Sequence, residues 1–342
     1  MALDGHSSKD SSVFGNYINA DDFRLIARRI GEGGFRRILR RVLGTKQTRV
    51  ETSWEKSEIP PTNWWDIPEV QDRWNRKVTG SGDTDFNDHV VATHFQHRRD
   101  LLGLSLGCGT GVREKRWAET GVFRRIDGYD LSEPRIATAK ALAESSGLAD
   151  VLHFETGDVY TKTFTETYDV VIVEGSLHHF SPLETILTRI SDLLTDDGYL
   201  LINEFVGPTQ FQWTDRQLHE INALLTALPD RLKTKWDGTS IKKRVGKPSK
   251  LCIRYGDPSE AIESGRILPL LEQMFSPVEV KGYGGTILHM LFHEIAHNFC
   301  TDDAEAKTWL QTCFDTEDAL IESGAFTSDF VAGVYRKKSS SP

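Results

Sequence analysis

Short apolar runs alternate with amphipathic stretches through the middle of the chain, and this alternation is its most regular feature. Runs bounded by turn residues predict five buried strands, at Leu101–Leu106, Arg125–Tyr129, Val151–Glu155, Tyr168–Val173 and Tyr199–Asn203. Between them, stretches of helical character predict helices over Glu114–Thr120, from Ser132 onward and over about 181–194. Strands that alternate with helices are typical of a doubly wound, mainly parallel α/β sheet.

The flanking segments extend this α/β core. Two more strands, which bring the total to seven, are expected at Val278–Val280 and Phe330–Tyr335, and two helices between them at about 286–299 and 303–322. Residues 207–255 break the alternation and predict an insertion that covers the ends of the strands. The expected division is a flexible tail at 1–20, an N-terminal helical cap at 21–95, the core at 96–206, the insertion or lid at 207–255, the remaining part of the core at 256–337 and a tail at 338–342.

Composition limits the classes of partner. The 342 residues carry a net charge of −9, whereas a broad nucleic-acid footprint needs a clustered basic surface. No apolar run reaches the roughly 18 residues that a transmembrane helix needs, and the first twenty residues lack a secretory apolar segment. Four scattered cysteines without a CxxC pair indicate a reduced, cytoplasmic protein. We therefore expect no nucleic-acid partner and no transmembrane segment, and the oligomeric state stays open.

The first predicted strand ends in a glycine-rich turn, GCGTG at 107–111. Such a turn lets a ligand approach the backbone closely, and the helix that follows offers free N–H donors. Asp130 lies 21 positions beyond Gly109, close to the roughly 20-residue spacing at which an acidic side chain meets ribose hydroxyls. The third glycine comes one position earlier than in the dinucleotide fingerprint. The pattern therefore disfavours a pyrophosphate and suits a cofactor with a short amino-acid tail.

Five motifs follow one another between Leu101 and Val206: LSLGCGTG (104–111), GYDLS (128–132), GD (157–158), YDVVIVEGSLHHF (168–180) and LLTDDGYLLINEF (193–205). In this order they resemble the class I S-adenosylmethionine-dependent methyltransferases. The resemblance implies a Rossmann-like fold whose seven-stranded, mainly parallel sheet ends in an antiparallel pair.

The same resemblance implies S-adenosylmethionine as the cofactor and S-adenosylhomocysteine as the product. The glycines of the turn would then lie alongside the methionine moiety, and Asp130 would hold the ribose. Asp158 and Val159 would hold the adenine, and Glu174 would lie beside the methionyl part. The full set of expected cofactor-binding residues is Gly107, Cys108, Gly109, Gly111, Asp130, Leu131, Asp158, Val159 and Glu174.

Two histidines and an acid follow the fourth and fifth predicted strands. A hydroxyl acceptor needs a base, and the unperturbed pKa of histidine suits that task best. His178 and His179 stand on the loop after the fourth strand, and Glu204 ends the fifth. A carboxylate that orients an imidazole is a recurrent base arrangement. We expect His179 as the base, His178 as the second candidate and Glu204 as the orienting carboxylate.

The SLHH-plus-acid pattern is similar to that of sugar O-methyltransferases from natural-product pathways. This implies a hydroxyl of a sugar, glycan or secondary metabolite as the acceptor. Related enzymes with LHH methylate carbon or nitrogen, so N- or C-methylation of a small metabolite is the alternative. No metal ligands are expected, and a Mg²⁺ ion held by carboxylates and the acceptor's hydroxyls is a lesser alternative. Candidates for an aromatic wall against a sugar ring, or for ordinary packing, are Phe205, Phe211, Trp213 and Tyr283.

A rival from another enzyme class comes from His293, Glu294 and His297, which match HExxH. On a helix, two histidines one turn apart bind zinc and the glutamate activates water, so the match predicts a zinc metallopeptidase with Glu317 as third ligand. By chance the motif arises in roughly one chain in forty of this composition, and a peptidase leaves the five ordered motifs unexplained. The simpler interpretation is an amphipathic helix whose apolar stripe is Leu288, Leu291, Phe292, Ile295 and Phe299.

Two clusters of positive charge remain. They comprise Arg36, Arg37, Arg40 and Arg41, and later Lys242, Lys243, Arg244, Lys247, Lys250 and Arg254. The simplest interpretation is that these charges lie on solvent-exposed faces of the protein. One alternative is a rim that attracts an anionic acceptor, such as a phosphorylated sugar, and another is weak membrane-surface association of the first cluster.

Overall fold

The structure is a computed structural model that describes residues 61–249 and 259–338. The chain divides into two compact units, residues 1–55 with 247–260 and residues 56–246 with 261–342. The second unit holds the sheet and the helices around it. The expected tail at 1–20, the arginine cluster around Arg36 and the last residues of the C-terminal tail lie outside the described residues.

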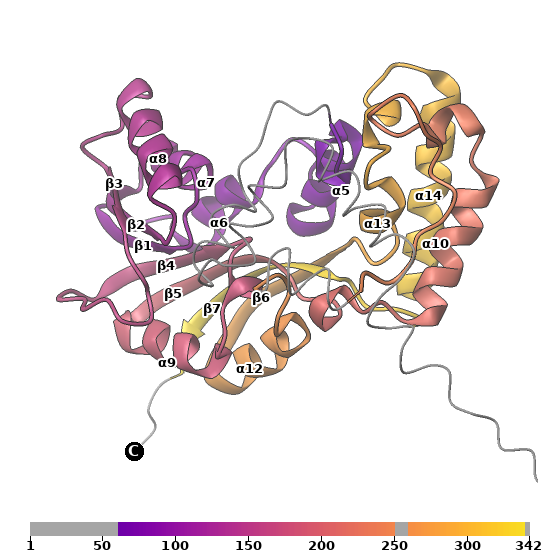
Figure 1. The fold of residues 1–342 in the computed structure, drawn as a ribbon. Coiled ribbons are helices and arrows are strands. Elements are labelled where there is room, and N and C mark those ends of the chain that lie inside the picture. The colour runs from indigo at the N-terminus through magenta and orange to yellow at the C-terminus, as the bar shows by residue number, and fades with distance from the viewer. Residues whose placement is uncertain (1–60, 250–258, 339–342) are drawn as a thin grey trace, which may run out of the picture. The chain divides into compact units, whose positions relative to one another are not determined.

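Seven strands form one sheet in the order β3-β2-β1-β4-β5-β7-β6 (Figure 1). The strands are β1 (Leu101–Leu106), β2 (Phe123–Asp130), β3 (Leu152–Thr156), β4 (Tyr168–Glu174), β5 (Leu194–Phe205), β6 (Phe275–Gly284) and β7 (Phe330–Lys337). The first five pair in parallel, and β7 is antiparallel to both β5 and β6. The predicted Rossmann-like sheet with its antiparallel pair is therefore confirmed.

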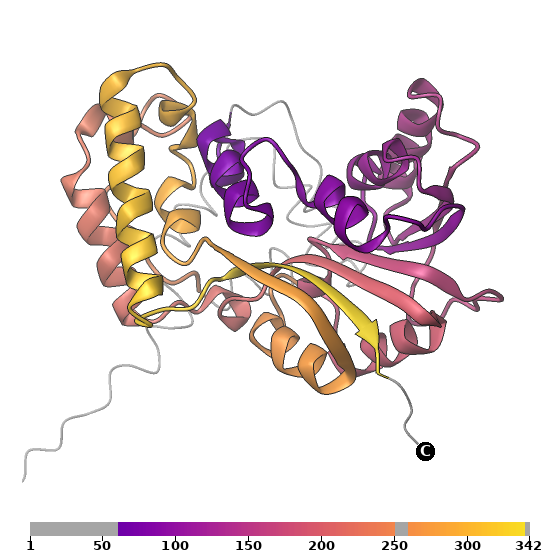
Figure 2. The ribbon, with the colours of Figure 1, turned by 180° about the vertical axis from the view of Figure 1, so that it is seen from behind.

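Helices cover both faces of the sheet (Figures 1 and 2). One face carries α5 (Pro68–Thr79), α6 (Phe86–His94), α7 (Val112–Glu119) and α8 (Glu133–Ser145), and the other carries α9 (Leu183–Leu193) and α12 (Ile267–Met274). The alternation of side chains along a strand produces the two layers. On β4, Val170 and Ile172 enter the core on the α7 side, whereas Val171 and Val173 enter the core on the α9 side.

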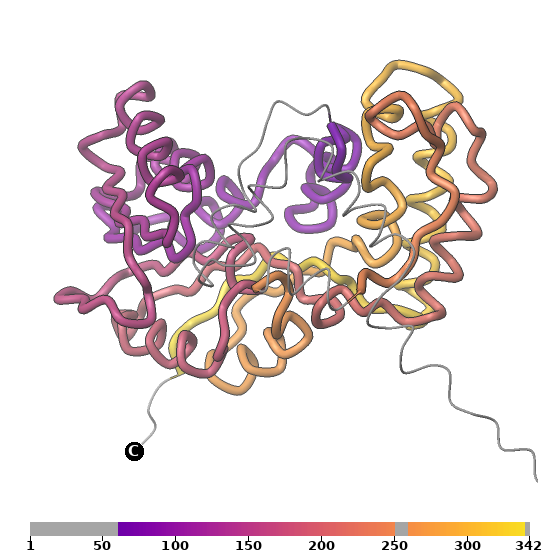
Figure 3. The backbone as a smooth tube through the Cα atoms, in the orientation of Figure 1, coloured from indigo at the N-terminus to yellow at the C-terminus, as the bar shows by residue number. Residues whose placement is uncertain are grey.

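Segments far apart in the sequence meet on the α9 face. The tube in Figure 3 shows α9 and α12 side by side beneath the sheet. Leu187 of α9 and Leu271 of α12 are both fully buried in the same apolar cluster. The part of the chain after the insertion is thus packed directly onto the core that precedes it.

A third group of helices, α10 (Asp215–Ala227), α13 (Leu288–Phe292) and α14 (Ala304–Glu322), stands to one side of the other helices (Figures 1 and 2). In this group α13 packs against both α10 and α14. The described part of the insertion is therefore mainly a helix that shares a core with the C-terminal region. The short 3-10 helices are η2 (Trp64–Asp66), η3 (Leu177–His179), η4 (Thr209–Phe211), η5 (Asp230–Lys233), η6 (Ser264–Arg266) and η7 (Ala296–Phe299).

Three elements differ most in extent from the sequence prediction. β6 spans Phe275–Gly284, whereas the sequence predicts only Val278–Val280. β5 begins at Leu194, five residues before the expected Tyr199, because Leu194 already pairs with Tyr168, and the register with β4 shifts between Tyr168 and Val170. The single helix expected at about 286–299 is wrong. It ends at Phe292, and the chain turns through Glu294 at a φ of +68° before η7 begins.

No helix in the described ranges combines the length and the apolar character needed to cross a bilayer.

Candidate active site

The loop after β1 is a backbone cradle built from glycines. Gly107, Gly109 and Gly111 have φ values of +77°, +58° and +77°, a left-handed conformation that side chains disfavour. A Cβ atom on Gly107 would lie 2.6 Å from the Cβ of Ser176, and one on Gly111 would lie 2.8 Å from the ring of Phe154. Both backbone conformation and space therefore require glycine, and the loop brings bare backbone to the first turn of α7.

Asp130 ends β2 and holds this loop in place. Its Oδ2 accepts a hydrogen bond from the backbone N–H of Gly109 at 3.0 Å, and its Oδ1 accepts one from Ser132 N–H at 2.8 Å. The carboxylate thus lies between the ends of β1 and β2, where ligands of open α/β sheets bind. This position fits the expected contact with ribose hydroxyls, since a carboxylate oxygen can accept more than one hydrogen bond.

The remaining expected cofactor residues on the β2 and β3 side differ in exposure. Asp158 is exposed and its Oδ1 accepts a hydrogen bond from the N–H of Tyr160 at 2.9 Å, while Val159 is buried. Leu131 is 38% exposed. Cys108 is buried, and burial raises the pKa of its thiol well above the ordinary value.

Glu174 ends β4, the strand that pairs directly with β1 and so lies next to the glycine loop. The indole Nε1 of Trp117 donates a hydrogen bond to its Oε1 at 2.8 Å. Burial raises the pKa of Glu174, and the nearby guanidinium of Arg113 opposes that effect. Sequence reasoning named Glu174 but missed Trp117, which lies on the inward face of α7 and fixes the carboxylate. From the sequence periodicity, that tryptophan would be expected only to fill the core.

Together these groups fit a nucleoside joined to an amino acid. The strand order puts the ends of β3, β2, β1 and β4 in a row, with polar groups at Asp158, Asp130 and Glu174 and bare backbone between them. The order reverses between β1 and β4, and the crevice at such a switch point is where open α/β sheets bind their ligands.

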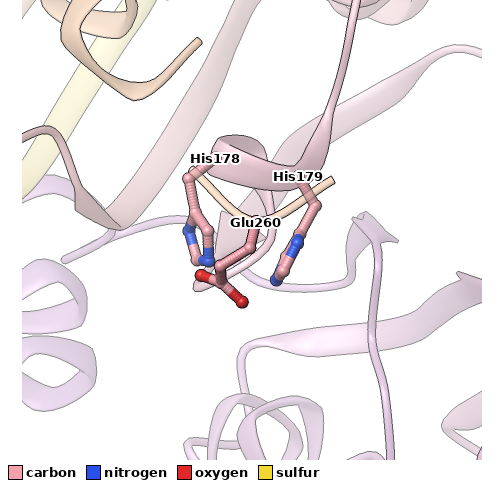
Figure 4. Close-up of side chains that lie close together, drawn as sticks. All are labelled: His178, His179 and Glu260. Atoms are coloured by element: carbon pink, nitrogen blue, oxygen red, sulfur yellow. The ribbon is translucent and has the colours of Figure 1, made fainter. Parts of the chain in front are cut away.

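The two candidate histidines lie side by side on η3, as Figure 4 shows. Their ring centroids are 4.2 Å apart. His178 Nδ1 lies 2.6 Å from Oε2 of Glu204, so the acid and the first of the two histidines form the predicted kind of pair. Glu260, also drawn in Figure 4, belongs to the other compact unit.

Glu204 is fully buried and organises the whole turn after β4. Its Oε1 accepts hydrogen bonds from the backbone N–H groups of Ser176 at 2.5 Å and Leu177 at 2.6 Å, while Oε2 faces His178. Ser176 adds a second anchor because its hydroxyl donates to the Leu106 carbonyl at 2.7 Å. The imidazole of His178 is therefore held by a carboxylate that two backbone N–H groups fix in turn.

The expected aromatic candidates divide into two groups. The Phe205 ring lies 6.4 Å from that of His178 and 5.0 Å from that of Phe211, which stacks on Trp213 at 5.2 Å. Tyr283 is buried, and its hydroxyl donates to Oδ1 of Asn203 at 2.5 Å. Phe205 thus lies next to His178 and joins it to Phe211, whereas Trp213 and Tyr283 are core side chains.

The peptidase interpretation of HExxH is wrong because the motif is not on one helix. α13 ends at Phe292, so His293 and His297 lie on opposite sides of a turn instead of one helical face. The Glu294 carboxylate forms an ion pair with Lys235 at 2.7 Å. Glu317, the expected third ligand, is buried and accepts the backbone N–H groups of Ile287 and Leu288.

The second basic cluster is not a uniform charged rim. Lys242 is buried, and its ammonium group donates to the carbonyls of Met290 at 2.6 Å, Leu291 at 3.1 Å and His293 at 2.6 Å. Lys243 and Arg244 are exposed, and Lys250 and Arg254 lie outside the described residues. At least one of the expected anion-attracting groups is therefore a structural cap for α13.

A sheet of this order, with a glycine loop after β1 and an acid at the end of β2, defines the class I S-adenosylmethionine-dependent methyltransferases. A family model described as a methyltransferase domain matches residues 100–272, slightly more than half of the chain. The chain belongs to this methyltransferase family.

Individual relatives match only in part. Erythromycin 3''-O-methyltransferase of Saccharopolyspora erythraea is 30% identical over 104 residues, which are 30% of this chain and 34% of that protein. The malonyl-acyl-carrier protein O-methyltransferase of Bacillus cereus is 25% identical over 123 residues, 36% of this chain and 44% of that protein. The chain thus spans less than half the length of these relatives. Among solved structures, the 4+2 cyclase SpnF has 15% identity and a TM-score of 0.43, with 82% of this chain and 99% of that chain covered.

Proposed function

We propose that this protein transfers the methyl group of S-adenosylmethionine to a hydroxyl of a sugar, glycan or secondary metabolite. The products are a methyl ether and S-adenosylhomocysteine. The cofactor supplies a sulfonium with a good leaving group, so the chain's own residues have to align the acceptor, exclude water and remove one proton. In this proposal Glu174, Asp130 and the glycine loop hold the cofactor, and the turn after β4 serves the acceptor.

The contact between His178 and Glu204 carries the proposal. A carboxylate accepts hydrogen bonds but does not donate them, so Nδ1 of His178 carries the hydrogen in their 2.6 Å contact. The other ring nitrogen, Nε2, is then the basic atom that receives the proton of a hydroxyl. The buried Glu204 also stabilises the imidazolium that forms, as the acid does in other His-based catalysts. We therefore place His178 first and His179 second as the base.

The names of two relatives support an oxygen-bearing acceptor. Both relatives named above are O-methyltransferases by name.

The test compares His178→Ala with His179→Ala. Methyl transfer from ¹³C-methyl S-adenosylmethionine to a panel of monosaccharides, glycosides and hydroxylated metabolites identifies an acceptor, and the product's methyl carbon shift distinguishes O- from N- or C-methylation. With that acceptor, His178→Ala should lower kcat by about 10²- to 10⁴-fold, the contribution expected of a general base. The dissociation constant of S-adenosylhomocysteine should stay within about twofold of the wild-type value in both variants.

Two outcomes would overturn the assignment. If His179→Ala abolishes turnover while His178→Ala retains it, the base is His179. If the methylated atom is nitrogen or carbon, the hydroxyl acceptor is wrong whatever the histidine variants do.

A further inference from the structure

Arg113 places a positive charge in the crevice between β1 and β4. It is the second residue of α7 and is exposed. Its guanidinium lies on the backbone of Gly175, the residue after Glu174: a Cβ atom on Gly175 would lie 2.5 Å from Nη1 and 2.9 Å from Cζ. The φ of Gly175 is +61°, so glycine is favoured there for the backbone conformation as well. The head of Arg113 thus reaches from the glycine-loop side to the end of β4.

The local structure does not explain this cation. A positive charge in the first turn of a helix opposes the helix dipole, so Arg113 does not stabilise α7. Among the described residues its guanidinium makes no hydrogen bond and no ion pair, although it has five N–H donors. Arg113 lowers the pKa of the buried Glu174, but the hydrogen bond to that carboxylate comes from Trp117. The charge is therefore available for a ligand.

Arg116, on the same helix, differs from Arg113 in having an ion-pair partner within the protein. It lies one turn further along α7, is also exposed, and forms an ion pair with Asp85 at the start of α6. Its charge has a structural partner within the protein. The two arginines differ in this respect although they share a helix and a degree of exposure.

The order of the strand ends indicates which part of the cofactor lies next to Arg113. If the adenine lies at the end of β3 and the ribose at Asp130 on β2, the remaining amino-acid tail runs over the β1 loop toward β4. That tail ends in an ammonium and a carboxylate. We propose that Arg113 binds the carboxylate of the cofactor's methionine moiety. The planar guanidinium matches a carboxylate with two parallel hydrogen bonds, and Gly175 leaves room for that approach.

This inference rests on the proposed placement of the cofactor but not on the proposed acceptor or base. It is tested by binding alone, with isothermal titration calorimetry and no acceptor present. The two probes are S-adenosylhomocysteine and its decarboxylated analogue, which keeps the adenosine, the thioether and the amine. The variants are Arg113→Gln, Arg113→Lys and, as a matched control on the same helix, Arg116→Gln.

Wild-type protein should bind S-adenosylhomocysteine about 10- to 100-fold more tightly than the decarboxylated analogue, the range expected when a charged hydrogen-bonded pair is lost. Arg113→Gln should weaken binding of S-adenosylhomocysteine by the same factor and leave binding of the analogue within about twofold. Arg113→Lys should fall between, because a lysine supplies the charge without the planar fork. Arg116→Gln should change neither.

If Arg113 has only a general structural role, Arg113→Gln should weaken the binding of both probes equally. That result would overturn the proposal, as would equal affinity of the wild-type protein for the two probes. If the wild-type protein binds neither probe, the placement of the cofactor is wrong together with the role of Arg113. The acceptor and the base are unaffected by any of these results, since methyl transfer is not measured.

Discussion

Glu114 is a buried carboxyl group on α7, and its Oε1 accepts a hydrogen bond from the hydroxyl of Ser105 on β1 at 2.6 Å. Burial raises its pKa from 4.5 to about 7. The folded protein therefore keeps this proton up to about pH 7, whereas the unfolded chain releases it near pH 4.5. Stability falls as the pH rises between these two values, because only the folded state then binds the proton.

This titration gives a prediction for Glu114→Gln. A glutamine still accepts the Ser105 hydrogen bond but does not ionise. Relative to the wild type, the free energy of unfolding of the variant should rise between pH 4.5 and pH 8 by on the order of 3 kcal/mol. Urea denaturation at the two pH values measures it. Glu119→Gln, an exposed change on the same helix, serves as the control, and parallel pH profiles of Glu114→Gln and the wild type would refute the prediction.

The positions of the site residues could be predicted from the sequence where a strand end fixes them, and could not where a single turn or a side-chain direction fixes them. His178 and Glu204 follow neighbouring parallel strands, so their meeting could be expected from the order of the motifs. Which of the two histidines meets the acid could not, because that depends on the single turn of η3. The position of Arg113 over Gly175 depends on a side-chain direction across the sheet, and no spacing rule reveals it.

At the scale of elements, the region around α13 shows what periodicity can and cannot predict. All five residues of the expected stripe, Leu288, Leu291, Phe292, Ile295 and Phe299, are buried. The helix nevertheless ends at Phe292, so the apolar spacing predicted the core correctly and the backbone wrongly. At this end of the helix, Lys242, some fifty positions earlier in the sequence, binds the carbonyls of Met290, Leu291 and His293.

Lys242 should therefore be important for the stability of this region. Lys242→Met leaves three carbonyls without their donor in a buried place, and it should lower the free energy of unfolding by about 2–4 kcal/mol. Lys243→Met is the matched control, since the neighbouring lysine is exposed and should change stability by less than about 0.5 kcal/mol. Chemical denaturation measures both. Equal stability of the two variants would mean that the carbonyls find other partners.

At the scale of the whole unit, one carboxylate links two elements that are far apart in the sequence, α6 and β6. Glu279 on β6 accepts hydrogen bonds from Nε2 of His89 at 3.0 Å and of His94 at 3.0 Å, both on α6. Its pKa is lowered because the two histidines outweigh the effect of burial. The sequence gives no hint of this link, because the partners are separated by about 190 positions and lie on elements that are not neighbours in the motif order.

The lowered pKa fixes the sign of the expected pH dependence. Glu279 stabilises the fold above its unfolded-state pKa of 4.5, and this contribution is lost as the pH falls through its folded-state value below 4.5. Glu279→Gln should lower stability at pH 6 by about 1 kcal/mol, a value kept small because the group is partly exposed. The difference from the wild type should shrink as the pH falls below 4.5. Thermal unfolding over this range measures it, and a difference that stays constant from pH 6 to well below pH 4.5 would contradict the ionic contribution.

The central claim for the whole molecule is that the ends of β1, β2 and β4 form the site for S-adenosylmethionine. Calorimetric titration with S-adenosylhomocysteine of the wild type, Asp130→Ala and His178→Ala tests it most directly. We predict one site per chain in the wild type, binding at least about tenfold weaker in Asp130→Ala because the ribose loses a charged acceptor, and unchanged binding in His178→Ala. The account would be contradicted if the folded wild-type protein bound no S-adenosylhomocysteine, or if Asp130→Ala bound it as tightly as the wild type.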